Sequence, residues 1–242
     1  MDGVLNALAQ RLALTLRWRP EWRVAAVVTA TWIALAAGLG THASHTGTHH
    51  AALAPIAGLP GWSLMVVAMM VPVTLPAIRH VGMSSMRSRR QRAMAIYTIV
   101  YVGVWVLFGI TALGTEHLVR VHLGISHTLV LAAVLAVAGA WQLTRAKRRA
   151  LFACGRTVPL PPLGRRADAG CTRYAVLQGW RCVKSCWAIM LVMVVVGHSS
   201  LVWMLALTAL VVAEELTVSG RRLTRPAAGA LGVAAVAVAL GL

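Results

Sequence analysis

Long apolar runs separated by short polar segments dominate the chain, beginning with an uninterrupted run over residues 24–40. Each run is about long enough to cross the ~30 Å hydrocarbon core of a bilayer as a helix. The hydrophobic content of 59% and the mean hydropathy of +0.74 agree with this pattern. We therefore predict an all-α fold, a polytopic membrane helical bundle of about seven transmembrane helices. The expected spans are residues 24–40, 62–80, 93–114, 128–144, 174–197, 201–218 and 227–242.

The segments outside these runs divide the chain. Residues 1–23 place leucines three or four positions apart among arginines, which predicts an amphipathic helix on the cytoplasmic membrane surface. Residues 24–242 are expected to form a single transmembrane helical domain, with a basic, proline-rich cytoplasmic loop at about 145–173. A cleaved signal peptide is the alternative for the first run, because residues 41–43 weakly resemble a cleavage site. The run is, however, longer than is usual for a signal.

The basic residues lie in clusters between the apolar runs. The net charge of +17 would suggest nucleic acid in a soluble protein, but here 22 of the 23 lysines and arginines fall on one predicted side, with Arg120 the exception. This asymmetry predicts a cytoplasmic N-terminus and an external C-terminus. It also favours anionic membrane lipid as a partner and argues against nucleic acid. The four cysteines fall in segments assigned to the cytoplasmic side, where thiols stay reduced.

Sulfur recurs at helical spacing in the fifth span. Four sulfur side chains fall within an arc of roughly 80° on a helix. They are Cys182, Cys186, Met190 and Met193. Gly179 and Gly197 share this arc and would permit close helix approach. Thiols and thioethers suit a soft metal ion, although methionine and cysteine also fill apolar cores.

A second stripe in the second span carries Met65 and Met69, whereas Met70 points elsewhere. Because this span runs inward and the fifth runs outward, the two stripes would offer sulfur at successive depths if the helices pack together. Such a ladder suits Cu(I), while Mg(II) and Ca(II) would require oxygen ligands.

Polar candidates lie on both predicted sides. Four histidines within ten residues form a candidate external capture site for Cu(II), Ni(II) or Zn(II), with solvated loop histidines as the alternative. They are His42, His45, His49 and His50. Glu214, beside Glu215 near the inner end of the sixth span, is a candidate metal ligand or proton acceptor, and a structural ion pair is the alternative. Cys154 and Cys171, in the proline-rich segment, could pass metal to a cytosolic carrier.

Enzyme motifs are missing from the sequence, so we expect no enzyme. There is no HExxH, Rossmann or Ser-His-Asp pattern, and Cys182 and Cys186 lie four apart rather than in a Cys-x-x-Cys motif. No predicted span carries a mid-membrane histidine for haem.

Several motifs together resemble a known family. They are the Trp62 to Pro72 segment with Pro76, Gly139 to Gln142 through Lys147, Cys154-Gly-Arg156, Cys182-x3-Cys186-Trp187-x2-Met190, and Trp203-Met204 through Glu214. Over residues 60–220 this pattern is similar to bacterial predicted metal-binding integral membrane proteins, grouped as domain of unknown function 2182. The chain departs from that pattern with Ser185 before Cys186, where the family tends to have a second cysteine.

We therefore expect a protein of the bacterial plasma or inner membrane that binds, and moves or holds, a soft transition metal, with copper favoured. A metal carrier or another subunit of a membrane complex would be its protein partner. The alternative is a non-catalytic scaffold or assembly subunit whose sulfur-rich face only packs against another helix.

Overall fold

The computed structural model describes residues 21–38, 58–197, 200–217 and 220–241, and these residues are almost entirely helical. Residues 1–20 of the predicted interfacial segment 1–23 and the four histidines of the predicted capture site lie outside them, and residues 22 and 23 begin α2. The elements are α2 (Trp22–Ala36), α5 (Leu59–Ser84), η2 (Arg87–Arg89), α6 (Arg90–Leu123), α7 (His127–Leu143), α8 (Arg145–Cys154), α9 (Gly164–Val196), α10 (Leu201–Leu216) and α11 (Gly220–Leu240). An all-α fold is confirmed for this part of the chain.

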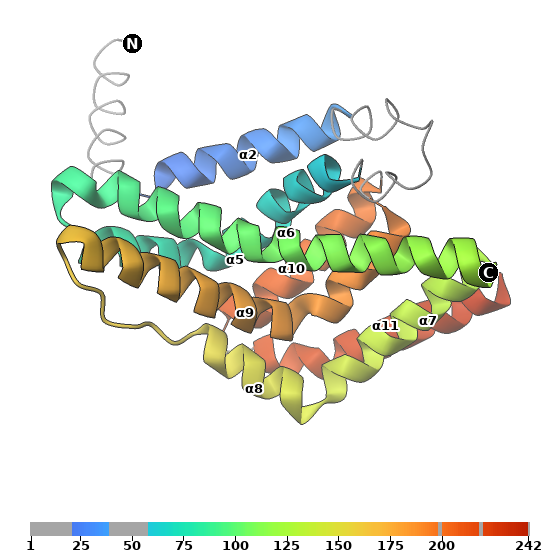
Figure 1. Ribbon diagram of the computed structural model, residues 1–242. Coiled ribbons are helices and arrows are strands. Elements are labelled where there is room, and N and C mark those ends of the chain that lie inside the picture. Colours follow the sequence, from blue (N-terminus) through green and yellow to red (C-terminus); the bar gives the residue numbers. More distant parts are fainter. Residues whose placement is uncertain (1–20, 39–57, 198–199, 218–219, 242) are drawn as a thin grey trace, which may run out of the picture.

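The helices form a bundle in which α6 packs along both α5 and α9 (Figure 1). α2 covers α5, α7 pairs closely with α11, and α10 contacts α5, α9 and α11. Close approach is possible where glycine faces a side chain of the neighbouring helix. A Cβ on Gly179 would lie 3.0 Å from the Cβ of Val104, so the predicted close contact at Gly179 is made with α6.

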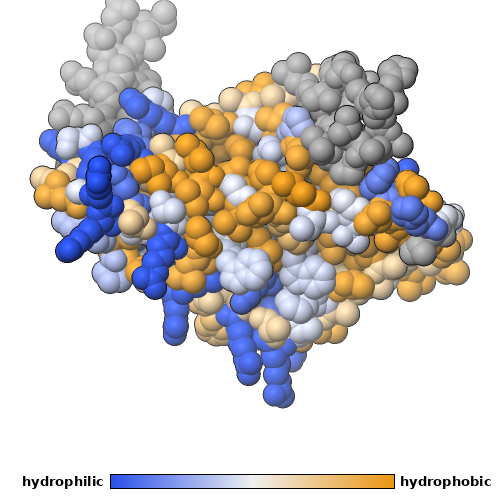
Figure 2. All heavy atoms as spheres, in the orientation of Figure 1, coloured by the Kyte–Doolittle hydropathy of each residue, from blue (hydrophilic) through white to orange (hydrophobic). Residues whose placement is uncertain are grey.

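Within the described residues, four helices are long and apolar enough to cross a membrane, and a bent pair makes a fifth if it counts as one span. The four are the segments Leu59–Ser84, Arg87–His122, Gly164–Val196 and Arg222–Leu240. The bent pair is α7 with α8, which meet at 72°. α2 is apolar but has only 15 residues, and α10 has 16. Hydrophobic side chains cover most of the face seen in Figure 2.

Two helices are longer than the hydrophobic pattern predicts. α6 continues to Leu123, through the segment expected to be an external loop, and a Glu116–Arg120 pair at 3.2 Å supports this extension. α9 begins at Gly164 rather than near Tyr174. At about 1.5 Å per residue each is roughly 50 Å long and so exceeds the hydrocarbon thickness. The polar residues at 115–123 and 164–173 therefore form helix ends and not loops.

The extended start of α9 joins two basic segments. Asp168 forms ion pairs with Arg89 and with Arg92, the latter at 3.1 Å. His80 Nε2 lies 3.0 Å from the carbonyl oxygen of Val158. The basic segment after α5 and the basic segment after α7 therefore meet at the same end of the bundle.

Candidate metal centre

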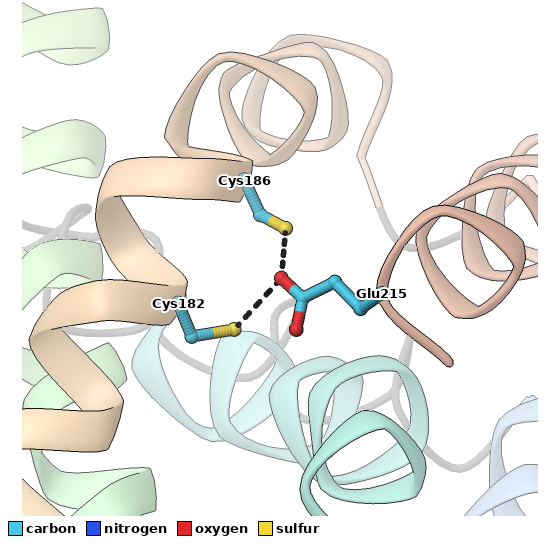
Figure 3. Close-up of side chains that lie close together, drawn as sticks. All are labelled: Cys182, Cys186 and Glu215. Atoms are coloured by element: carbon cyan, nitrogen blue, oxygen red, sulfur yellow. Dashed lines mark hydrogen bonds between the residues drawn. The ribbon is translucent and has the colours of Figure 1, made fainter. Parts of the chain in front are cut away.

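Two thiols on one face of α9 converge on a carboxylate of α10 (Figure 3). Cys182 and Cys186 are one turn apart, and both are buried. Cys186 Sγ lies 3.3 Å from Glu215 Oε1, and Cys182 Sγ lies 3.8 Å from the same oxygen. One donor atom from each of the three residues fits within 4.8 Å of the others, which is a spacing that a single metal ion could bridge.

Two hydroxyl groups hold these donors in place. Ser185 Oγ donates to Glu215 Oε1 at 2.6 Å and lies 3.3 Å from Cys186 Sγ. The hydroxyl of Tyr101, on α6, donates to Cys182 Sγ at 3.1 Å and lies 3.3 Å from the carbonyl oxygen of Met70 on α5. Hydrogen bonds of this kind orient metal ligands and are worth about 10- to 100-fold in metal affinity.

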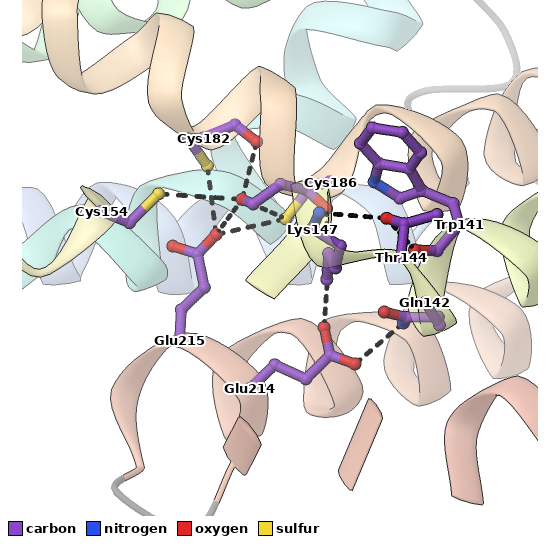
Figure 4. Close-up of polar contacts among 10 residues, drawn as sticks. Trp141, Gln142, Thr144, Lys147, Cys154, Cys182, Cys186, Glu214 and Glu215 are labelled. Carbon is purple, nitrogen blue, oxygen red and sulfur yellow. Dashed lines mark hydrogen bonds and ion pairs between the residues drawn. The ribbon is translucent and has the colours of Figure 1, made fainter. Parts of the chain in front are cut away.

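The neighbouring glutamate has a different environment (Figure 4). Glu214 Oε2 lies 2.8 Å from the ammonium nitrogen of Lys147, and neither side chain is exposed. Gln142 Nε2 donates to the other carboxylate oxygen at 2.8 Å. The Lys147 ammonium also donates to the Ser185 carbonyl oxygen at 2.7 Å. Glu214 is thus part of an ion pair that ties α10 to α8 and α9.

The sharp bend after α7 brings Lys147 to this position. Thr144 has an extended backbone and ends α7, and its hydroxyl oxygen accepts a hydrogen bond from the Lys147 backbone N–H at 3.1 Å. Threonine is a favoured residue at such a helix start. In α8 only Lys147 and Leu151 are buried, so the helix is amphipathic. The chain therefore places one cation in the interior and leaves the other basic residues of α8 near the surface.

The local charge balance favours a cation. Glu214 and Glu215 both lie in the last turn of α10, where the carboxyl end of the helix dipole already carries partial negative charge. Among the described residues, only Lys147 forms an ion pair with either of them. Lys147 neutralises Glu214, and Glu215 is left facing thiols and a hydroxyl. A bound cation or a proton would offset this remaining charge.

A small cavity lies beside the cluster. It has a volume of about 260 Å³ and is lined by Glu215 and Cys154, together with residues of α5 and α9. Cys154 Sγ lies 3.8 Å from Ser185 Oγ. Cys154 is the last residue of α8 rather than part of an irregular loop, and it is only partly buried. Cys171, also expected in that loop, is instead a buried residue of α9.

The methionines of the two predicted stripes are buried, and so is Met70, which the sequence pattern placed off the stripe. Met65, Met69, Met190 and Met193 are each at most 2% exposed, but Met70 is equally buried. α6 packs against both α5 and α9. Tyr101 of α6 lies between them at the level of Met70 and Cys182. The methionines therefore belong to one buried hydrophobic core, and Tyr101 of α6 contacts both α5 and α9 at this level.

The structure brings together Cys182 and Cys186 as predicted, and adds partners that the pattern did not identify. These are Glu215, Ser185, Tyr101 and Lys147. Glu214, the predicted ligand, forms an ion pair with Lys147, which is the alternative that the sequence also allows. The motif that runs from Gly139 through Lys147 was a signal for Lys147.

The donor set fits a soft ion of low charge. Thiolates bind Cu(I), Zn(II) and iron–sulfur clusters, whereas hard divalent ions need several oxygens. Two thiols and one carboxylate oxygen are too few for Ca(II) or Mg(II), and a closed zinc site takes four ligands. Two sulfurs with a third, weaker donor suit Cu(I). The fold and this cluster together define an apolar helical protein with a buried thiol–carboxylate group that could hold a soft metal ion.

Comparison with known families agrees with this class. A family model described as copper chaperone, PpoB2, matches residues 59–238. That stretch is well over half of the chain and contains the whole cluster, so the protein belongs to this copper chaperone family. No curated protein and no solved structure matches the chain.

Proposed function

We propose that this protein binds Cu(I) between α9 and α10 inside the membrane and passes it on, without transforming a substrate. The observation that carries this proposal is the convergence of Cys182, Cys186 and Glu215 within 4.8 Å. Membership of the copper chaperone family names the same metal independently.

The Glu215 carboxylate could accept a proton when a thiol binds the metal. The thiol of Cys186 donates to Glu215 in the metal-free site. If Cu(I) bound this sulfur, the S–H bond would break, the sulfur would keep the electron pair and the Glu215 carboxylate would take the proton, which leaves the carbonyl oxygen of a neutral carboxyl group as the weak third donor. The second thiol, Cys182, would lose its proton through the cavity that Glu215 lines. Copper and sulfur do not change oxidation state. Release would reverse both transfers, so one of the two thiol protons would stay inside the site and only the other would exchange with solvent.

The small cavity at Cys154 supplies an entry or exit route. Both Glu215 and Cys154 line it, and Cys154 is the only thiol outside the pair that does so in the described part of the chain. We propose that copper passes between Cys154 and the pair by ligand exchange, with a metal carrier as the partner on the basic side. Transfer between successive thiols requires no large movement of the helices.

The proposed topology has seven spans, a cytoplasmic N-terminus and an external C-terminus, in the plasma or inner membrane of a bacterium. The contact of Asp168 with Arg89 and Arg92 supports a common side for the two large basic segments. The likeness to domain of unknown function 2182 supports the bacterial membrane. Thiol labelling from outside should reach single-cysteine probes near Ser44 and Gly124 but not near Arg89 or Gly164. Labelling near Gly164 would reject this topology.

Metal analysis of detergent-purified protein tests the function. Protein from cells grown with copper, zinc and nickel should contain about one soft-metal ion per chain. The Cys182→Ser/Cys186→Ser variant should lose it, because serine keeps much of the size but not the soft donor. Cys171→Ser is the matched control: Cys171 is also a buried thiol of α9, about 16 Å along the helix from Cys182.

The scaffold alternative gives a different result. A protein that only packs against another subunit would contain background metal in the wild-type chain. Metal retained at the wild-type level by the double serine variant would also reject the thiol site.

A further inference from the structure

A second pocket, apart from the metal centre, is lined by three arginines. It lies between the end of α7, the start of α8 and the start of α11, and its volume is about 490 Å³. Its lining residues are Gln142, Leu143, Arg148, Arg222, Thr224 and Arg225. Figure 2 shows hydrophilic side chains projecting along the lower edge of the molecule, where Figure 1 places α8, next to a largely hydrophobic face.

Among the described residues, no carboxylate balances the positive charge of this pocket. The chain has only six acidic residues against 23 lysines and arginines. No described carboxylate forms an ion pair with Arg148, Arg222 or Arg225. Glu214, which lies on the other side of Gln142, is already held by Lys147. Guanidinium groups bind phosphate oxygens with paired hydrogen bonds, so three of them around one pocket favour a phosphate group.

A buried amide in the wall of the pocket adds a second requirement for the ligand. Gln142 is 1% exposed, and its Nε2 donates to Glu214. Its Oε1 has no hydrogen-bond partner among the described residues. An unpaired buried acceptor costs free energy, which a ligand with a hydroxyl group would recover. The pocket therefore combines donors for an anion with an acceptor for a hydroxyl.

We infer that this pocket binds a phosphate group that also carries a hydroxyl. An anionic glycerol headgroup at the membrane surface has this chemistry, and so does free hydrogen phosphate. The position of the pocket beside the hydrophobic face would place a lipid headgroup over Arg148 while its acyl chains remain against apolar surface. The site is independent of copper binding, although Gln142 connects its wall to the ion pair of Glu214.

Native mass spectrometry of the full chain in detergent can test this binding. The probes are phosphatidylglycerol, phosphatidylmethanol, which has the charge but no headgroup hydroxyl, and zwitterionic phosphatidylcholine, all with the same acyl chains. Phosphatidylglycerol should be retained about tenfold better than phosphatidylcholine, in keeping with charge-assisted hydrogen bonds. Inorganic phosphate that competes at millimolar concentration would identify the free anion as a ligand, whereas lipid retained despite phosphate would identify the headgroup.

Matched variants separate the pocket from general surface charge. Arg148→Gln/Arg222→Gln/Arg225→Gln should abolish the preference for phosphatidylglycerol. Arg87→Gln/Arg145→Gln/Arg149→Gln removes the same charge from exposed residues outside the pocket and should preserve it. Helix content by circular dichroism checks that both variants fold. Equal loss in the two variants, or no preference for phosphatidylglycerol or phosphate in the wild type, would overturn the site. Equal retention of phosphatidylmethanol and phosphatidylglycerol would overturn the role given to Gln142.

Discussion

Glu214 and Glu215 are adjacent on α10, yet they lie in chemically opposite environments. Glu214 is held between Lys147 and Gln142, so its charge is compensated by the protein itself. Glu215 faces Ser185 and two thiols, and no described cation pairs with it. A rotation of about 100° between successive helical residues separates the two groups. One carboxylate completes the protein's internal charge balance, and the other leaves a place for a cation from outside.

This difference predicts that substitutions in the two regions affect different properties of the protein. Changes around Glu214 should act on stability, because they alter a closed buried ion pair. Changes around Glu215 should act on copper, because its partners in the metal-free protein are neutral groups. Figure 4 shows how close the two regions lie, so variants that separate them must be conservative in size.

The largest effect is expected for Lys147→Met. Removing one partner of a buried pair leaves the other charge unpaired, which typically costs about 3–5 kcal/mol in the free energy of unfolding. Lys147→Met/Glu214→Leu removes both charges and should recover most of this loss. Thermal unfolding in detergent, followed by circular dichroism, measures the stability of the single and the double variant. A double variant as unstable as the single one would show that the pair does not act as a unit.

A smaller effect, confined to copper, is expected for Glu215→Gln. The amide keeps the size and can still accept from Ser185, but it removes the charge and the proton acceptor. The affinity for Cu(I), measured by competition with a chromogenic chelator, should fall by about 10- to 100-fold.

Glu214→Gln provides the matched control for that experiment. It leaves the Lys147 ammonium without its carboxylate, so the unfolding temperature should fall while the Cu(I) affinity of the folded protein stays near that of the wild type. Equal copper loss in the two variants would contradict the division of roles between the two glutamates.

The sequence pattern located most of the described helices because each of them contains a long apolar run. Each predicted span contains a helix, from α2 to α11. The pattern failed at helix ends such as residues 115–123 and 164–173. The expected boundaries were placed where the hydropathy falls, but a helix can continue beyond that point into polar surroundings. It also placed Cys154 and Cys171 in a loop, although both are helical.

The candidate site could be predicted only as far as one helix reaches. Spacing along α9 was enough to join Cys182 and Cys186. To identify Glu215 and not Glu214 as the neighbour of the thiols, one must know how α10 is rotated relative to α9. Residue spacing within a single helix does not determine this rotation. Lys147 looked like one more basic residue after α7, because the bend at Thr144 that turns it inward depends on tertiary packing.

The smallest effect is expected for the methionines beyond the thiols, and it tests whether the metal region extends along α9. Met190 and Met193 follow Cys186 by one and two turns and are buried. Met190→Leu/Met193→Leu should change the free energy of unfolding by less than about 1.5 kcal/mol, because leucine has a similar volume. Copper content should stay the same, since the thiols remain. If the thioethers lie on the path, the rate of copper transfer to a chelator, measured by stopped-flow absorbance, should fall a few-fold. Met70→Leu is equally buried on α5 and should leave that rate unchanged. A double variant that behaves like Met70→Leu would assign these methionines to helix packing and confine the metal region to the thiols and Glu215.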